Sequence, residues 1–440
     1  MIQYKDALEF LTAAAALRRP LFEAVPETVA LENCVGRLLF ADLLSPEAIP
    51  PFDNSSMDGF AVHSALTAAA TLRAPLQLKV LGSIAAGDTP VVKSEENSQP
   101  VAWEIMTGAP IPHGFDAVVK VEDIEVKRDA QGAPVEIWIS KPLTARENFR
   151  GRGEDFALNQ LVARAGDRLM PEHVMALASL GLAEVSVKRR PRVALVSTGS
   201  ELVTHSTKEL TPGMIRNSTA PHLMAALPGY GVDCHFYGTL IDRPEVFEWA
   251  LGEILQHAPD IILTTGAVSK GKHDFIPDTL LKSGAKTQFH QVAIRPGKPG
   301  LFCEFENGPV VFGIPGNPVS TAVALRFFVS HYLEALTGAR PELPLKARLV
   351  AAAPKPEGLR CFFKAQFHAG SEGGEVRCLG GQPSFMVSPM LESNAWVVFP
   401  EEGSTVAEGT WVDVYPLHPL NYNFGAEVLS GPAPKAGGCC

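Results

Sequence analysis

Short apolar runs that alternate with amphipathic stretches dominate the middle of the chain. Buried-strand patterns cover residues 193–197, 235–241 and 261–265, and each is followed by a turn and a helical pattern. A further run, VVFGI, ends in a P-G-N-P turn that puts Asn317 at a helix N-cap and Pro318 at the first helical position. This alternation predicts an α/β domain built on a doubly wound parallel sheet.

Two stretches outside this region carry a different pattern. Between residues 76 and 139, short β runs are separated by Gly, Pro and Asp, which is typical of a small all-β module. The flanking stretches, an amphipathic N-terminal segment and a helix that starts at Pro171, look like two halves of a mixed domain. A second β-rich region follows Arg340 and ends near Phe424, and we expect the tail after it to be disordered.

Length, charge and cysteine content narrow the choice of function. A chain of 440 residues is too long for a single core, and its net charge of −10 argues against a general binder of nucleic-acid backbones. Its seven cysteines contain no C-x-x-C pair, which indicates reduced thiols rather than a disulfide framework. No apolar run reaches the length of a membrane span, so we expect a cytoplasmic protein with no membrane partner.

The stretch DIILTTGAVSKGKHDFIPDTL, residues 260–280, has the features of a ligand site at a strand end. The buried strand stops at Gly266, and the polar loop that follows carries Lys270 and Asp274. Glycine lets the backbone approach a ligand here, while the lysine and the aspartate suit an anion and a metal. The stretch also fits the P-loop pattern G-x-x-x-x-G-K, but His273 stands where that loop needs Ser or Thr, which excludes a P-loop.

Charged side chains follow several predicted strands of the same domain. Because parallel strands bring their carboxyl ends to one edge of the sheet, these groups would face a single crevice. Such a set suits a magnesium-bridged phosphate ester, since magnesium binds one or two carboxylates together with substrate oxygens. Simpler explanations exist: Asp242 could only cap a helix, and Glu201 could only line a first helical turn. The set comprises Glu201, Asp242, Lys270, Lys272, Asp274, Arg295, Lys298 and the amides of Gly316 and Asn317.

Three further segments are rich in small polar residues and acids. Asp58 lies in PPFDNSSMDGFAV, Thr107 lies in IMTGAPIP, and Asp155 lies in NFRGRGEDF. Taken singly, the segments are typical of a surface loop, a turn and a solvated linker.

Together, the segments resemble the signature blocks of one family. PPFDNSSMDGFAV, IMTGAPIPHGFDAVV, NFRGRGEDF, VSTGSEL, TTGAVSKGKHDF, VAIRPGKP and GIPGNPVST are similar to blocks of the molybdopterin molybdenumtransferases, which include the bacterial MoeA proteins and the C-terminal domain of gephyrin. The resemblance covers about residues 1–424, in the same order. Two positions depart from it: Arg295 stands where many relatives have lysine, and Ala267 replaces a glycine often seen after TTG.

The resemblance implies an elongated homodimer with four domains in each chain. The resemblance is also compatible with transient contact with an adenylyltransferase or with apo-molybdoenzymes, which the sequence leaves open. The expected parts are a split linking domain at residues 1–47 and 152–188, an inserted β domain at 48–151, an α/β molybdopterin-binding domain at 189–339, a C-terminal β domain at 340–424 and the tail at 425–440.

The resemblance also implies a reaction. The family takes adenylylated molybdopterin and molybdate, cleaves the adenylate with a divalent cation, here expected to be Mg²⁺, and inserts molybdenum into the dithiolene. The residues implied as catalytic are Asp58, Thr107 and Asp155, expected from the partner chain, with Glu201, Asp242 and Asp274, which are also the implied metal ligands. Those implied as substrate-binding are Gly199, Gly266, Ser269, Lys270, Arg295, Lys298, Pro315, Gly316, Asn317, Pro318, Ser320, Arg360 and Ser384. Of these, Arg295, Lys298, Ser320, Arg360 and Ser384 are the expected molybdate ligands.

Two other functions are compatible with parts of this pattern. An adenylyltransferase that makes adenylylated molybdopterin resembles the α/β domain, but such proteins favour a TTGGTG loop and lack the flanking β modules, whereas this chain has TTGAVSKG and both modules. A gephyrin-like scaffold would use the fold as a binding platform, and it would not need carboxylates at several strand ends.

Overall fold

The protein, represented by a computed structural model, is described over residues 1–89, 100–268, 275–371 and 373–419. It separates into two compact units, each assembled from discontinuous segments. The first contains Met1–Ala41, Ala165–Met170 and Glu184–Cys440, and the second contains Asp42–Arg164 and Pro171–Ala183. Ser269, Lys270, Lys272, Asp274 and the expected tail at 425–440 lie outside the described residues. The four-domain division stays a prediction.

A six-stranded sheet forms the centre of the first unit, in the order β16-β13-β17-β21-β20-β18. Its strands are β13 (Arg192–Thr198), β16 (Asp233–Leu240), β17 (Ile261–Thr265), β18 (Lys286–His290), β20 (Leu301–Glu304) and β21 (Val310–Ile314). β16, β13, β17 and β21 are parallel, whereas β20 runs antiparallel to both of its neighbours. The prediction of a doubly wound sheet is confirmed, although the alternation of strands and helices gave no sign of the reversed strand.

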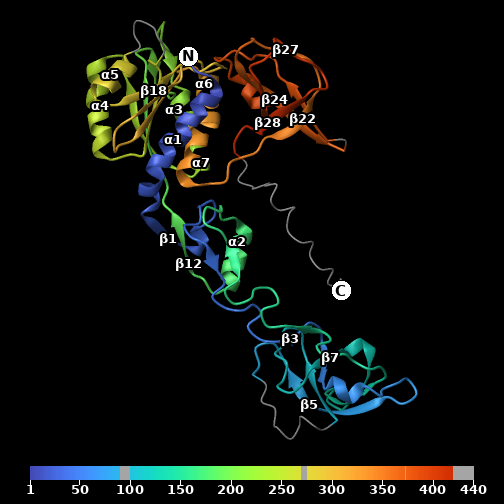
Figure 1. The fold of residues 1–440 in the computed structure, drawn as a ribbon. Coiled ribbons are helices and arrows are strands. Elements are labelled where there is room, and N and C mark those ends of the chain that lie inside the picture. The colour runs from blue at the N-terminus through green and yellow to red at the C-terminus, as the bar shows by residue number, and fades with distance from the viewer. Residues whose placement is uncertain (90–99, 269–274, 372, 420–440) are drawn as a thin grey trace. The chain divides into compact units, whose positions relative to one another are not determined.

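Helices cover both faces of this sheet (Figure 1). They are α1 (Tyr4–Glu23), α3 (Thr219–Ala226), α4 (Pro244–Gln256), α5 (Ile276–Lys282), α6 (Pro318–Ala324) and α7 (Ser330–Thr337), with a π-helical turn (Leu325–Val329) joining the last two. Leu263 faces the cluster that contains residues of α1, α3, α6 and α7, whereas its neighbour Ile262 faces the cluster of α4 and α5. Successive strand residues point to opposite faces, so a strand covered on both sides is apolar throughout.

The C-terminal part of the first unit is a second six-stranded sheet. Its strands are β19 (Ile294–Arg295), β22 (Leu345–Leu349), β24 (Arg360–Gly370), β25 (Gly373–Cys378), β26 (Ala395–Phe399) and β28 (Trp411–Pro416). β24, β25, β22, β28 and β26 pair in a closed ring, which removes free strand edges. β19 comes from the loop after β18, yet it pairs in parallel with β24. The two sheets are therefore joined by backbone pairing.

The second unit contains another six-stranded sheet, in the order β7-β4-β6-β5-β9-β8. Its strands are β4 (Gly59–Val62), β5 (Leu76–Ile84), β6 (Val101–Ile105), β7 (Ala117–Lys120), β8 (Glu125–Arg128) and β9 (Pro134–Ile139). The predicted small β module is confirmed. A short pair between β3 (Asn54–Ser55) and β10 (Phe149–Arg150) brings the Asp58 loop alongside the NFRGRGEDF segment. The unit also holds β2 (Leu43–Leu44), β11 (Leu161–Ala163) and α2 (Pro171–Ser179).

Leu263→Ala should lower the free energy of unfolding by about 2–5 kcal/mol, because it leaves a cavity at a fully buried position in β17. Urea unfolding followed by tryptophan fluorescence measures the loss. Leu281→Ala is the control: its side chain in α5 is 62% exposed, and we expect a change within about 0.5 kcal/mol. Equal losses in the two variants would contradict the assignment of the core to the centre of this sheet.

Candidate active site

The carboxyl ends of β13 and β16 are joined by reciprocal hydrogen bonds. Ser200 N donates to Asp242 Oδ2 at 2.9 Å, and Asp242 N donates to Ser200 Oγ at 3.0 Å. Gly199 N also donates to Leu240 O at 3.1 Å. These bonds hold the Asp242 carboxylate against the turn that follows β13.

The simpler explanations for Asp242 and Glu201 are both wrong. The N-cap of α4 is Arg243, without a side-chain cap bond, because the Asp242 carboxylate is already bonded to the backbone of Ser200. Glu201 does not line a first helical turn, since the next element is the short strand β14 (Leu202–Val203). A Cβ built on Gly199 would lie 2.9 Å from Glu201 Oε2, so this carboxylate also lies over the turn. The two acids flank the same pair of residues, Gly199 and Ser200.

Gly266 allows the end of β17 to lie against the end of β13. Its φ is +91°, and a Cβ there would lie 2.3 Å from Thr198 O. Gly266 N donates to Ile314 O at 3.0 Å, which ties β17 to the end of β21. A Cβ on Gly316 would lie 3.7 Å from Gly266 Cα. Glycines thus line the carboxyl ends of three neighbouring strands, where a ligand can reach the backbone.

A second group of predicted site residues gathers where β19 meets β24. Ile294 is registered with Arg360, and Arg295 with Cys361, in parallel. Arg295 and Lys298 are exposed. The pairing places two predicted oxyanion ligands, Arg295 and Arg360, one residue apart in register on adjacent strands.

The start of α6 lies between the other members of this group. A Cβ on Gly297 would lie 3.8 Å from Ser320 O, which places the P-G-K-P turn beside α6. Val319 N donates to Ser384 O at 3.0 Å, which brings the segment around Ser384 to the same place. Ser320 itself is only 3% exposed. Asn317 occupies the predicted N-cap position of α6, although its side chain makes no cap hydrogen bond.

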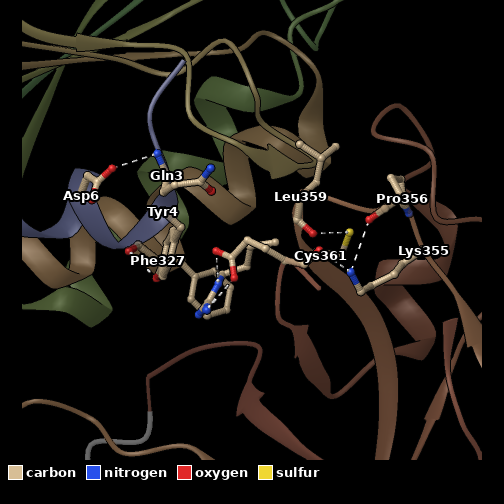
Figure 2. A network of polar contacts seen from close by, with 10 residues as sticks. Gln3, Tyr4, Asp6, Phe327, Lys355, Pro356, Leu359 and Cys361 are labelled. Atoms are coloured by element: carbon tan, nitrogen blue, oxygen red, sulfur yellow. Dashed lines mark hydrogen bonds and ion pairs between the residues drawn. The ribbon is translucent and has the colours of Figure 1, made fainter. Parts of the chain in front are cut away.

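Arg360 is held by an acid that the sequence did not single out. Its guanidinium makes an ion pair with Glu401, and its Cζ lies 4.9 Å from the centre of the Tyr4 ring. Lys355, which is 5% exposed, donates to the backbone carbonyl of Glu401 at 3.1 Å. Figure 2 shows this network, with Tyr4 and Phe327 on one side and Lys355 and Cys361 on the other.

The predicted acids of the second unit are found in two neighbouring loops. Asp58 is exposed, and its Oδ1 accepts hydrogen bonds from Thr107 N at 2.7 Å and from Thr107 Oγ1 at 2.9 Å. The backbone bond and then the hydroxyl bond hold the pKa of Asp58 below its usual value. Asp155 is exposed and is anchored by its backbone, since its N donates to Ile49 O at 2.9 Å. Thr107 therefore orients Asp58, as their joint prediction would require.

An apolar groove of about 440 Å³ lies beside the start of α6. Pro318 and Trp396 are among its walls, and none of the described cations predicted for the site lines it. The described residues predicted to bind an oxyanion therefore do not line this groove.

The thiols of the buried Cys303 and the partly buried Cys234 are not candidates for nucleophiles. Burial raises the pKa of Cys234 and of Cys303 to about 11, so both remain protonated near neutral pH.

Sequence reasoning missed the residues that hold the predicted ones in place. Ser200 orients Asp242, and Glu401 and Tyr4 flank Arg360. Ser200 could have been found as a small polar residue directly after a strand, between two predicted site residues. Glu401 had no local signal, because it is 41 positions from Arg360 in the sequence.

Three family models match the chain. The MoeA N-terminal region (domain I and II) matches residues 2–181, a probable molybdopterin binding domain matches 194–335, and the MoeA C-terminal region (domain IV) matches 346–417. The flanking modules that distinguish this chain from an adenylyltransferase are thus matched by MoeA regions.

Curated relatives and solved structures extend the likeness over most of the chain. A molybdopterin molybdenumtransferase of Synechococcus elongatus is 38% identical over 95% of this chain and 100% of the relative. A protein of the same name from Haemophilus influenzae is 33% identical over 91% of this chain and 96% of that relative. The crystal structure of a molybdopterin biosynthesis moeA protein from Pyrococcus horikoshii has a TM-score of 0.78 at 28% identity, covering 94% of this chain and 99% of that one.

Gly266→Ala should destabilise the protein more than Gly284→Ala. Both glycines have positive φ, which costs a Cβ about 1–2 kcal/mol, but only at Gly266 does the Cβ meet backbone, at Thr198 O. Around the Gly284 Cβ nothing lies within 4 Å. We expect an additional loss of about 1–3 kcal/mol for Gly266→Ala in thermal unfolding. Equal melting temperatures would mean that the strand ends do not need this close approach.

Thr107→Val should raise the pKa of Asp58 part of the way toward about 3.9, because the hydroxyl bond is lost while the backbone bond remains. A lowered pKa means that the bond stabilises the folded state at neutral pH and that this contribution is lost as pH falls through the folded pKa. The substitution therefore shifts that loss to higher pH. Carbon-detected NMR titration measures it.

Asp53 is the internal control for this titration. Its pKa is lowered by Arg146 and by the backbone of Arg152, and it should titrate unchanged in the variant. A change at both acids would indicate a rearranged loop rather than the loss of one bond.

Proposed function

The chain belongs to the MoeA family of molybdopterin molybdenumtransferases, and from this premise we propose how its residues transfer molybdenum to molybdopterin. It is an enzyme of molybdenum cofactor biosynthesis, with molybdopterin and molybdate as substrates. The observation that best supports the proposal is the placing of two acids over one glycine-containing turn at the strand edge, Asp242 by its bond to Ser200 and Glu201 beside Gly199.

The acidic edge is proposed to act on the adenylylated form of molybdopterin. Glu201, Asp242 and Asp274 would bind Mg²⁺. The described part of the site fits this ion: no hydrogen bond from a described residue reaches Asp242 Oδ1, and Ser200 fixes the other oxygen. Glu201 and Asp242 would hold the ion together with waters and substrate phosphates, which magnesium uses as ligands. When bound, the ion would neutralise negative charge on the phosphate oxygens that join molybdopterin to AMP.

The second group of residues is proposed to bind molybdate, a tetrahedral dianion. Cations and hydroxyls are the groups that an oxyanion requires, and guanidinium groups can bind two oxygens at once. The proposed ligands are Arg295, Lys298, Ser320, Arg360 and Ser384. Arg295 is exposed, and its short strand β19 pairs with β24, which carries Arg360.

The remaining acids are proposed to act across a homodimer. Asp58, Thr107 and Asp155 would approach the strand edge of the partner chain, and Thr107 would keep Asp58 ionised and oriented.

Within the described residues no helix is long and apolar enough to cross a membrane. We propose that the enzyme acts in the cytoplasm. Transient contact with an adenylyltransferase or with apo-molybdoenzymes would deliver its substrate and accept its product.

Release of AMP from adenylylated molybdopterin tests this function. We expect release by the wild type with magnesium, stimulated by molybdate, and a loss of about 100-fold in Asp242→Ala, because a positioned charge that assists the reaction is removed. Asp233→Ala is the matched control. Asp233 begins β16, at the opposite end of the strand from Asp242, and it pairs with Arg190. The Asp233→Ala variant should therefore release AMP at nearly the wild-type rate.

Two results would contradict the proposal. If the wild type released no AMP and instead made the adenylylated compound from molybdopterin and ATP, the protein would be an adenylyltransferase. If Asp242→Ala and Asp233→Ala lost activity equally, the strand edge would not be the reacting site.

A further inference from the structure

The guanidinium of Arg360 is bound by Glu401 along one edge only. Arg360 Nε donates to Glu401 Oε1 at 3.1 Å, and Arg360 Nη2 donates to Glu401 Oε2 at 3.1 Å. This is the side-on form of a bidentate pair, which uses two of the five N–H groups. The edge formed by Nη1 and the other hydrogen of Nη2 receives no acceptor from the described residues. That edge has the fork geometry that matches two oxygens of an oxyanion.

The rest of the guanidinium is also constrained. Tyr4, from α1, lies against it with a ring-to-Cζ distance of 4.9 Å, a contact of the cation–π type. Arg360 N donates to Ala293 O at 3.0 Å, which fixes the backbone beside β19. Figure 2 shows Tyr4 and Phe327 on the α1 side of this network. Rotation of the guanidinium is therefore limited by Tyr4 on one face and by Glu401 at one edge.

Glu401 is in turn held by its own neighbours. Lys355 Nζ donates to Glu401 O at 3.1 Å, and Gly358 N donates to the same carbonyl at 2.9 Å. Burial of Glu401 acts to raise its pKa, but the hydrogen bonds and charge of Arg360, the backbone hydrogen bond of Glu401 and the charge of Lys355 together hold the pKa below its usual value. The carboxylate therefore stays charged at neutral pH and remains a fixed acceptor.

The Glu401 carboxylate has two opposing effects on the affinity of this site for an anion. It cancels one positive charge and so weakens the attraction for any anion. It also orients the arginine; partners that orient metal ligands commonly change metal affinity by about 10–100-fold, and by the same reasoning a partner that orients an oxyanion ligand should change oxyanion affinity. Because Glu401 occupies the Nε edge and leaves the Nη1 edge free, it does not compete for the hydrogen bonds that an oxyanion would use. Orientation is therefore the larger effect here.

We propose that Glu401 is a positioning residue of the oxyanion pocket, which aims the free edge of Arg360 at a tetrahedral dianion. The inference rests on the proposed function, since it takes Arg360 as a molybdate ligand. It explains why an anion-binding site would contain an acid: the carboxylate fixes the orientation of the arginine, although it cancels one positive charge. Binding would then depend on the matching of two oxygens to a fixed fork more than on net charge.

The test is direct binding of molybdate to the full-length protein by calorimetry, with no pterin present. Glu401→Gln should weaken binding by about tenfold, although it makes the site more positive. Arg360→Ala should weaken binding at least as much. In the double variant, Glu401→Gln should add no further loss, because Glu401 acts through Arg360.

Asp413→Asn is the matched control. It removes the partner of Lys346 in an exposed ion pair between β22 and β28 of the same closed sheet, so its molybdate affinity should equal that of the wild type. Melting temperatures of all variants report on folding separately. Glu401→Asp, which keeps the charge on a shorter side chain, should fall between Glu401→Gln and the wild type.

The outcomes separate the inference from the function on which it rests. Tighter binding by Glu401→Gln, or a loss that persists in the Arg360→Ala background, would overturn the positioning role. Wild-type affinity in Glu401→Gln would do so as well. An absence of molybdate binding in the wild type would instead contradict the oxyanion site itself.

Discussion

The parallel pairing of β13 with both β16 and β17 determines where two acids of the first unit, Glu201 and Asp242, lie. Val193 is registered with Cys234 on one side and with Ile261 on the other, so the three strands end together. Glu201 and Asp242 are separated along the chain by an entire helix and strand, yet they flank the same turn because their strands end at the same edge. Gly266 is needed for the same reason, since a Cβ would meet Thr198 O at 2.3 Å and push the strand ends apart.

A second pairing, between β19 and β24, connects the α/β domain to the closed C-terminal sheet. It involves only two residue pairs, but it aligns the loop of Arg295 with the strand of Arg360. Next to this pairing, the Arg360 guanidinium is held by the partly buried Glu401 and Tyr4, and the buried Lys355 donates to the backbone of Glu401. Charges removed from water are costly unless they are paired or hydrogen-bonded; here Arg360 pairs with the Glu401 carboxylate, and the Lys355 ammonium donates to the backbone carbonyl of Glu401.

These two places divide the chemistry of a molybdenumtransferase. In the proposed function, the strand edge would supply carboxylates for a metal-assisted cleavage, whereas the residues around the β19–β24 pairing would supply cations for an oxyanion. Both include the region after β21: Gly316 approaches Gly266, and Ser320 and Val319 approach the P-G-K-P turn and Ser384. The P-G-N-P turn and the start of α6 therefore lie next to both groups of residues.

The sequence by itself determined the local elements. The apolar run at Ile261–Thr265 required a strand buried on two faces, and the glycines after the strands marked the edge where a ligand could approach. The motif blocks indicated the family and its implied site residues, because members of the family share particular residue types in a fixed order along the chain. Only the tertiary structure decided that Asp242 bonds to Ser200 instead of capping α4, that β20 is reversed, and that Glu401 holds Arg360. The physical reason is that the two side-chain contacts join residues 42 and 41 positions apart, and no local pattern of polarity records which distant group will meet a given side chain. The direction of β20 depends on which edges it pairs with, which its own residues do not specify.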